Sequence, residues 1–281
     1  MSENELNGKV VMMTGAGRGM GRAMSIGLAS AGAKLAMIDI DEDVLNDAAD
    51  LVENAGGQGA AMRLVADVTS AENAAAATQK VLDQFGQIDV LVNDAVVGPE
   101  RIGSNFFTEK TKFWDLDDDL WLQMLNVNVY GPQLMARTVV PHMLEQGWGR
   151  IVNITTSLDT MYLAGAGCYG PSKAALEAHT KIMAQDLEDT GIGVNILIPG
   201  GPVNTRMIPE ETGIPREALI QPDVMVRPII WLSSDDSDGI HCMRFIAALW
   251  DPKLHRETRI EKAGAPVAWT QIESRSINPE Y

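Results

Sequence analysis

The sequence has few of the residues that build disulfide-rich or metal-dependent folds. It contains two cysteines, Cys168 and Cys242, and four histidines, and neither set has the spacing of metal ligands. We therefore expect no metal site and a reducing compartment, the cytoplasm, where disulfide frameworks are rare. Apolar runs fall short of the ~18 residues that a membrane-spanning helix needs. The polar, acidic start MSENELNGKV also lacks the pattern of a signal peptide.

Positive charge is scarce as well. The chain has 22 Lys and Arg against 38 Asp and Glu, which gives a net charge of −16. Nucleic acids and anionic membranes are polyanions, so this charge argues against both as partners. The same charge argues against a strongly anionic substrate, although its simplest reading is solubility. We expect the partner to be a small molecule.

Short apolar runs alternate with longer segments of helical periodicity. The runs lie at 10–13, 35–38, 60–65, 90–92, 151–154, 194–198 and 245–248. The helical segments lie at 20–31, 43–54, 71–85, 116–144, 171–187 and 222–232. Strands that are apolar throughout are buried on both faces, as in a parallel sheet covered by helices. The pattern predicts an α/β fold in one domain.

A glycine-rich turn follows the first predicted strand and leads into a helix. Its sequence is TGAGRGMG, from Thr14 to Gly21. Glycines let the backbone approach a phosphate, and the free N–H groups at the start of the helix attract a pyrophosphate. A tight turn between strand and helix is the alternative, but the context fits a dinucleotide. The expected contacts are Gly15, Gly17, Arg18, Gly19, Met20 and Gly21.

Acidic residues follow the next two predicted strands. A carboxylate at Asp39, about 20 residues beyond the turn, accepts hydrogen bonds from ribose hydroxyls and repels a 2′-phosphate. The sequence therefore predicts NAD, even though Arg18 in the turn would favour NADP. We expect Ile40 to line the adenosine end. Asp67, with Val68 beside it, is placed to accept from the adenine amine.

Tyr169 and Lys173 lie four residues apart in the run YGPSK, on one face of a predicted helix. A phenol has a pKa of about 10, but a nearby cation favours the phenolate. A tyrosine tuned in this way can take a proton from an alcohol or give one to a carbonyl. The pair alone is more often a surface contact, so its meaning depends on the other motifs.

Together the motifs resemble those of the classical short-chain dehydrogenases/reductases over residues 8–248. They are TGAGRGMG, Asp67-Val68, NDAV at 93–96, NVNVYG, IVNITTS, YGPSK and IPGGPVNT. The resemblance implies a single Rossmann-type doubly wound domain over 1–250, with a seven-stranded, mostly parallel sheet and helices on both faces. It also implies a homotetramer or homodimer. Residues 251–281 would form a C-terminal extension over the pocket or a subunit interface.

The resemblance implies a role for each matching residue. Tyr169 would be the acid/base, Lys173 would lower its pKa and bind the nicotinamide ribose, and Asn128 would hold a water in a proton relay. Either Thr156 or Ser157 would orient the substrate oxygen, because the spacing favours Thr156 and the family habit favours Ser157. Further cofactor contacts would come from Asn93, Ala95, Val96, Pro199, Gly200, Val203 and Thr205.

Two of the chain's departures from the family pattern lie in NDAV and in PGGPVNT. Asp94 and Val96 stand where the usual NNAG motif has Asn and Gly, and Val96 narrows the wall beside the nicotinamide. The run PGGPVNT has one residue more than usual, so the roles of Val203 and Thr205 shift by one position in the alternative alignment. Whether Val96, Val203 and Thr205 contact the cofactor therefore depends on where the fold places them.

These features predict an NAD-dependent enzyme that interconverts a secondary alcohol and a ketone. Apolar and aromatic residues at 106–114, at 161–163 and after Pro199 predict a medium-sized apolar, cyclic or aromatic substrate. An NADPH-dependent ketone or 3-oxoacyl-type reductase is the first alternative. A catalytically silent NAD-binding regulatory protein is the second, although a protein without catalysis has no chemical need for Tyr169, Lys173 and Asn128 together.

Overall fold

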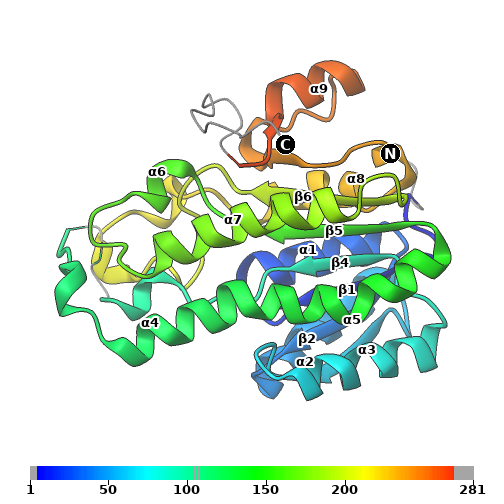
Figure 1. The fold of residues 1–281 in the computed structure, drawn as a ribbon, viewed down its shortest axis with the longest axis horizontal. Helices are drawn as coiled ribbons and strands as arrows, with labels where there is room; N and C mark the ends of the chain where they lie inside the picture. Colours follow the sequence, from blue (N-terminus) through cyan, green and yellow to red (C-terminus); the bar gives the residue numbers. More distant parts are fainter. Residues whose placement is uncertain (1–4, 104–105, 107, 269–281) are drawn as a thin grey trace, which may run out of the picture.

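The computed structural model shows one sheet with helices on both faces (Figure 1). The structure describes residues 5–103, 106 and 108–268. Within these residues the sheet has eight strands in the order β3-β2-β1-β4-β5-β6-β7-β8. Every neighbouring pair is parallel except β7 and β8. The predicted fold class is confirmed, with one strand more than the seven expected.

The elements fall close to the predicted segments. The strands are β1 (Val10–Thr14), β2 (Lys34–Asp39), β3 (Ala61–Val65), β4 (Val90–Asn93), β5 (Gly149–Ile154), β6 (Ile192–Ile198), β7 (Met243–Ile246) and β8 (Gly264–Pro266). The helices are α1 (Gly19–Ser30), α2 (Glu42–Gly56), α3 (Ala71–Phe85), α4 (Asp118–Leu125), α5 (Gly131–Gln146), α6 (Leu158–Met161), α7 (Tyr169–Asp186), α8 (Val226–Leu232) and α9 (Arg256–Ala263).

Two apolar cores lie on opposite faces of the sheet. One packs α1, α2 and α8 around residues such as Leu28, Leu45 and Ile229. The other packs α3, α5 and α7 around residues such as Val81 and Leu134. Because both faces are covered, all residues of β1, β4, β5 and β6 are buried. The edge strand β3 differs from the expectation of a fully buried strand, since it is largely accessible.

The helix predicted over 116–144 is divided by a π turn, Asn126–Tyr130. The N–H of Gly131 donates to the carbonyl of Asn126, five residues earlier, which widens the helix there. Such turns are frequent at functional sites because they move side chains out of the regular helical register. Here the turn contains the buried Asn128.

Part of the predicted C-terminal extension belongs to the sheet. Strand β8 pairs antiparallel with β7, and α9 precedes it. Trp250, where the extension begins, packs against Trp231 and Phe245 with ring centroids 4.8 and 5.9 Å away. Trp269 lies outside the described residues, so the covering role of the extension stays a prediction.

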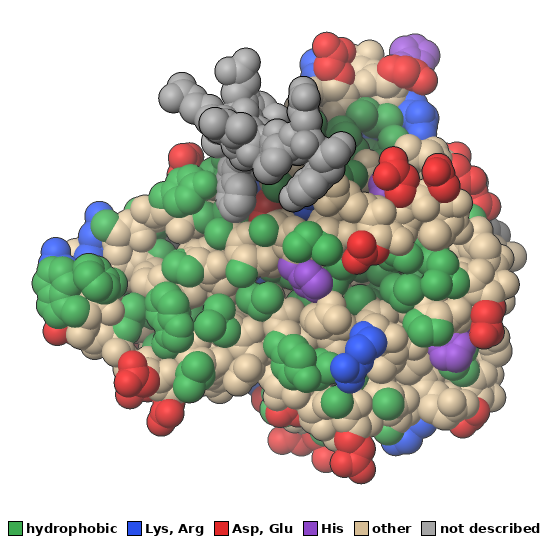
Figure 2. Space-filling view, in the orientation of Figure 1, with side chains coloured by type: hydrophobic (Ala, Val, Ile, Leu, Met, Phe, Trp, Pro, Cys, Tyr) green, Lys and Arg blue, Asp and Glu red, His purple; other side chains and the backbone are tan. Residues whose placement is uncertain are grey.

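The outer face of α4, α5 and α7 carries scattered hydrophobic side chains (Figure 2). Leu122, Leu144 and Ile182 are each about half exposed on these helices. The predicted homotetramer or homodimer stays a prediction. No helix among the described residues is long and apolar enough to cross a membrane.

Candidate active site

The order of the strands places a crevice at the carboxyl ends of β1 and β4. Strand β1 pairs with β2 on one side and with β4 on the other, so the chain reverses direction across the sheet at this point. In open parallel sheets, ligands bind at such a reversal, beyond the carboxyl ends of the strands. The glycine turn follows β1 and the segment NDAV follows β4, so both motifs meet here.

The glycine turn is packed so closely that side chains do not fit. A Cβ on Gly15, whose φ is +67°, would lie 2.8 Å from the backbone of Ala95. A Cβ on Gly21 would lie 2.1 Å from the carbonyl oxygen of Gly15. The turn therefore leaves bare backbone at the crevice, where a phosphate group needs a close approach.

The start of α1 is open to an anion. No side chain caps the helix at Arg18, and its first turn contains no acidic residue. The N–H of Gly21 in this turn donates to Asp94, so the positive end of the helix dipole and the N–H groups of Gly19 and Met20 are the part that would face a pyrophosphate. These residues fit a dinucleotide as the sequence predicts.

The adenosine end is arranged around a fixed carboxylate. Asp39 accepts hydrogen bonds from the N–H of Gly17 at 2.9 Å and from the N–H of Asp41 at 3.2 Å. Arg18 forms an ion pair with Asp41 at 2.8 Å, which lowers the pKa of Asp41. The guanidinium thus already has a carboxylate partner. Beside them Ile40 is 69% exposed, which suits a contact with a flat apolar ring.

The other residues predicted near the adenosine differ in how they present their side chains. Asp67 accepts from the N–H and the hydroxyl of Thr69 at 2.8 and 2.7 Å. Val68 is buried, and Ala95 packs against the glycine turn. The amide of Asn93 donates to Asn153 at 2.8 Å inside the protein. Asn93 therefore ties β4 to β5 through its side chain, and its predicted place beside the adenosine ribose stays a prediction.

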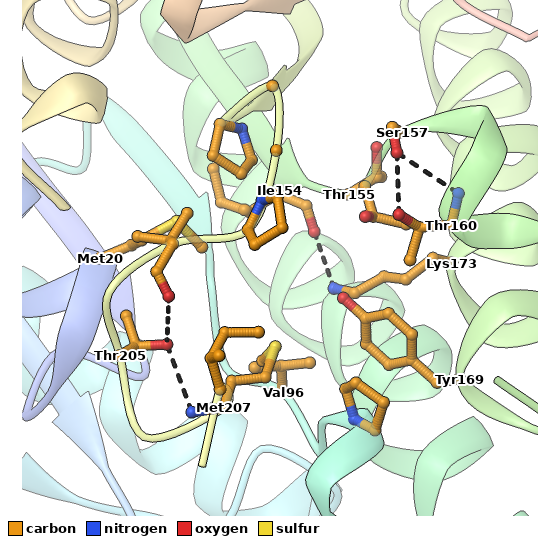
Figure 3. A pocket seen from close by; sticks show the side chains of 18 of the residues that line it. Met20, Val96, Ile154, Thr155, Ser157, Thr160, Tyr169, Lys173, Thr205 and Met207 are labelled. Carbon is orange, nitrogen blue, oxygen red and sulfur yellow. Dashed lines mark hydrogen bonds between the residues drawn. The ribbon is translucent and has the colours of Figure 1, made fainter. Parts of the chain in front are cut away.

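One cavity brings together much of the predicted site (Figure 3). The cavity is partly open to solvent and offers about 120 Å³ to the centres of water-sized spheres. The predicted residues that line it are Met20, Val96, Thr156, Ser157, Tyr169, Lys173, Pro199, Gly200, Val203 and Thr205. Val203 and Thr205 thus both face the cavity, although PGGPVNT is one residue longer than the usual motif.

Tyr169 and Lys173 converge as their spacing predicts. In Figure 3 the phenol oxygen and the ammonium group point to the same part of the cavity, and Lys173 donates to the carbonyl of Ile154 at 2.8 Å. Burial raises the pKa of Tyr169, which outweighs the lowering by a hydrogen bond with Thr156. Burial also lowers the pKa of Lys173. The expected lowering of the Tyr169 pKa is therefore absent here, because burial and the nearby carboxylates of Glu100 and Asp94 disfavour the phenolate.

The structure separates the two candidate hydroxyls. Ser157 caps the short helix α6, and its hydroxyl bonds the backbone and side chain of Thr160 at 3.3 and 2.8 Å. Thr156 instead lies close enough to Tyr169 that its side chain favours the phenolate. Both residues line the cavity, so the predicted hold of Thr156 or Ser157 on a substrate oxygen stays a prediction, and the contact with Tyr169 favours Thr156.

Asn128 lies behind Lys173 and outside the cavity lining. Its side chain accepts from the N–H of Val97 at 2.8 Å and donates to the carbonyl of Val97 at 3.0 Å. It also donates to Ser172 at 2.9 Å. These bonds hold the segment after β4 against α7. The predicted water relay through Asn128 stays a prediction.

The remaining walls are mostly apolar and only partly as predicted. Phe106 is buried against Ile208 and lines the cavity. By contrast, Phe113 and Trp114 are 77% and 68% exposed and contact each other edge-to-face, and Tyr162 is 68% exposed. The predicted role of these exposed rings in the pocket is wrong. Met161 and Leu163 are also absent from the described lining, and Phe107 lies outside the described residues.

Sequence reasoning assigned no function to several residues in the described lining, among them Asp94, Pro99, Thr155 and Thr160. Asp94 was noted only as a departure from the family pattern, whereas Met207 and Ile208 lie in the segment after Pro199 that was predicted to shape the pocket. Apart from Lys173, Asp94 is the charged side chain in the described lining of the cavity. The unusual Asp in NDAV was the available signal.

Comparisons with known proteins agree with this arrangement. The family model "short chain dehydrogenase" matches residues 9–213. An uncharacterized oxidoreductase of Thermotoga maritima is 36% identical over 69% of this chain and 71% of its own length. The fluoren-9-ol dehydrogenase of Terrabacter sp. is 33% identical over 70% of this chain and 57% of its own length.

Solved structures extend the agreement to the fold. NAD⁺-bound xylitol dehydrogenase has a TM-score of 0.72 and 26% identity, covering 84% of this chain and 95% of that one. Another similar structure contains NADP, so the comparisons support nicotinamide cofactors as a class. The family match, the doubly wound sheet and the assembled Thr156, Tyr169 and Lys173 agree: the chain belongs to the short-chain dehydrogenase family of oxidoreductases.

Proposed function

We propose that the protein is an NAD-dependent dehydrogenase that interconverts a secondary alcohol and a ketone. The observation that carries the proposal is the convergence of Thr156, Tyr169 and Lys173 in one largely apolar cavity beside the glycine turn. A hydroxyl, a phenol and a cation at one point are the groups needed to hold an oxygen and move its proton.

The residues divide the chemistry among them. NAD⁺, held by the glycine turn and by the segment from Pro199 to Thr205, supplies the hydride acceptor. Thr156 donates a hydrogen bond to the substrate oxygen and fixes its position. Tyr169 takes the hydroxyl proton at its phenol oxygen, and Lys173 stabilises the resulting phenolate. In the reverse direction Tyr169 returns that proton to the ketone oxygen.

The choice of NAD over NADP rests on charge at the adenosine end. The Asp39 carboxylate is held in place by two backbone N–H groups. A 2′-phosphate there would meet a fixed negative charge, while the nearest basic side chain, Arg18, is paired with Asp41. Ribose hydroxyls instead gain an acceptor at Asp39.

The cavity walls favour an apolar substrate. Met20, Phe106, Met207 and Ile208 line it, and charged side chains in the described lining are limited to Asp94 and Lys173. A relative acts, by its name, on fluoren-9-ol, a rigid aromatic secondary alcohol. We infer a medium-sized cyclic or aromatic alcohol as the substrate class.

A substrate and cofactor screen tests the proposal. Cyclic and aryl secondary alcohols with NAD⁺ should give cofactor reduction, followed by absorbance, at rates well above those of short polyols. The same screen with NADP⁺, and with ketones and reduced cofactors, separates the alternatives. A preference for NADPH and 3-oxoacyl thioesters would support the reductase, and tight NAD binding without turnover would support the regulatory protein.

Replacing Thr156 with Val should lower kcat/KM by about 10²-fold, because the substrate oxygen loses a positioned donor. The change keeps the β-branched shape of the side chain. Ser157→Ala is the matched control, since it removes a hydroxyl that caps α6 and should cost about 1 kcal/mol of stability. Equal kinetic losses in both variants, measured by steady-state assay, would contradict the assignment of Thr156.

A further inference from the structure

Asp94 is a buried carboxyl group that the proposed reaction does not use. It directly follows β4, is 8% exposed, and lines the cavity that contains Tyr169 and Lys173. Its N–H donates to the hydroxyl of Thr14 at 3.1 Å, which fixes the residue beside the end of β1. A charge so removed from water needs compensation from its surroundings.

The compensation comes from groups on three elements. The N–H of Gly21 in α1 donates to Asp94, and a Cβ on Gly21 would lie 2.8 Å from its Oδ2 atom. Lys173 of α7 attracts the carboxylate across the cavity, and Asp39 of β2 repels it. Tyr169 of α7 is also within its field, since Asp94 helps to raise the pKa of the phenol.

This position matters because the two states of the cofactor differ in charge. The oxidised nicotinamide ring carries a positive charge and the reduced ring is neutral, whereas the pyrophosphate is common to both. A carboxylate in the same poorly solvated cavity attracts the first ring and leaves the second unaffected. Lys173 acts in the opposite sense, so Asp94 offsets its repulsion of the cationic ring.

We propose that the Asp94 carboxylate makes this cavity bind NAD⁺ more tightly than NADH. The inference rests on the proposed function, and it concerns cofactor discrimination rather than the proton transfer at Tyr169. Its consequence is that reduced cofactor leaves more readily after alcohol oxidation. Asp94 would act through the attraction between its negative charge and the positive ring of the bound cofactor.

The pH dependence follows from the same charges. Burial raises the pKa of Asp94, so the group gains its negative charge at higher pH than an ordinary carboxyl. NAD⁺ affinity should therefore rise with pH, while NADH affinity should not. Burial lowers the pKa of Lys173, so this residue also loses its proton as the pH rises. NAD⁺ then meets one repelling cation less, which raises NAD⁺ affinity further. An Asp94 variant should keep the share due to Lys173 and lose the rest.

The test is calorimetric binding of NAD⁺ and NADH to the full chain and to Asp94→Asn. The amide keeps an acceptor for Gly21 and removes the charge, so the ratio of Kd for NADH to Kd for NAD⁺ should fall by about tenfold. Asp94→Glu should restore part of the ratio. The matched control is Asp89→Asn, which removes a buried carboxyl at the opposite end of β4, where Asp89 accepts from Val10 at 2.7 Å.

Each outcome decides between the readings. A purely structural role for Asp94 would weaken both cofactors equally and lower Tm without changing the ratio, which would overturn the proposal. If Asp94→Asn does not fold, Asp94→Ser provides the neutral variant. The unmodified chain gives a second test: a ratio of Kd for NADH to Kd for NAD⁺ that stays constant from about pH 6 to about pH 9 overturns this proposal and leaves the proposed function standing. Failure of the unmodified chain to bind either nucleotide would instead overturn the proposed function.

Discussion

Replacing Tyr169 with Phe is expected to lower kcat for alcohol oxidation by about 10²- to 10⁴-fold, the share that a positioned acid/base contributes. The phenyl ring fills the same buried place, since Tyr169 is 6% exposed, so the cavity keeps its shape. The substitution removes only the hydroxyl group whose oxygen takes the substrate proton. NAD⁺ affinity, measured by calorimetry, should stay close to that of the unmodified protein.

Tyr162 offers a matched control for this variant. It is 68% exposed at the end of α6 and outside the described cavity lining, so Tyr162→Phe makes the same chemical change away from the site. Turnover of Tyr162→Phe should equal that of the unmodified protein. Near-normal turnover of Tyr169→Phe on the same alcohol would refute the acid/base assignment.

Replacing Asp39 with Asn is expected to move the cofactor preference strongly towards NADP⁺. Two unit charges about 4 Å apart interact by about 4 kcal/mol at an effective dielectric constant of ~20, so removing this repulsion changes the preference by about 10³-fold. The amide keeps an acceptor for the N–H of Gly17, which preserves the glycine turn. The measurement is kcat/KM with NAD⁺ and with NADP⁺ on one alcohol.

The control for Asp39→Asn removes the same charge elsewhere. Asp50 on α2 is exposed and pairs with Arg63 at the surface, so Asp50→Asn removes one negative charge without touching the crevice. An equal shift of preference in both variants would show that the overall acidity of the protein, rather than Asp39, excludes NADP⁺. No shift in either would contradict the predicted adenosine site.

The cofactor site was largely predictable because its signals are local. The glycines of the turn, the helix that follows and Asp39 at the end of β2 depend on the short-range geometry of strand, turn and helix. The structure confirms the fold class and places these residues at one crevice. The spacing of Tyr169 and Lys173 also follows from one turn of helix.

The errors lie in segments whose contacts come from distant parts of the chain. Phe113 and Trp114 resemble a pocket wall in sequence, yet they are exposed and contact each other edge-to-face. Of the described rings in that loop, Phe106 alone reaches the cavity. The π turn at Asn128 and the pairing of β8 with β7 are likewise invisible to local periodicity. Each depends on which surfaces the fold brings together.

The sequence by itself determined the class of chemistry and its main participants, because residue type and helical or strand spacing decide which groups share a face. Only the tertiary structure showed that the Ser157 hydroxyl caps a helix while the Thr156 side chain acts on the Tyr169 phenol, which favours Thr156. The tertiary structure also put Asp94 in the cavity of Tyr169 and Lys173. The burial of a residue and the charges around it depend on segments that are far apart in the sequence, and these segments meet only when the chain folds.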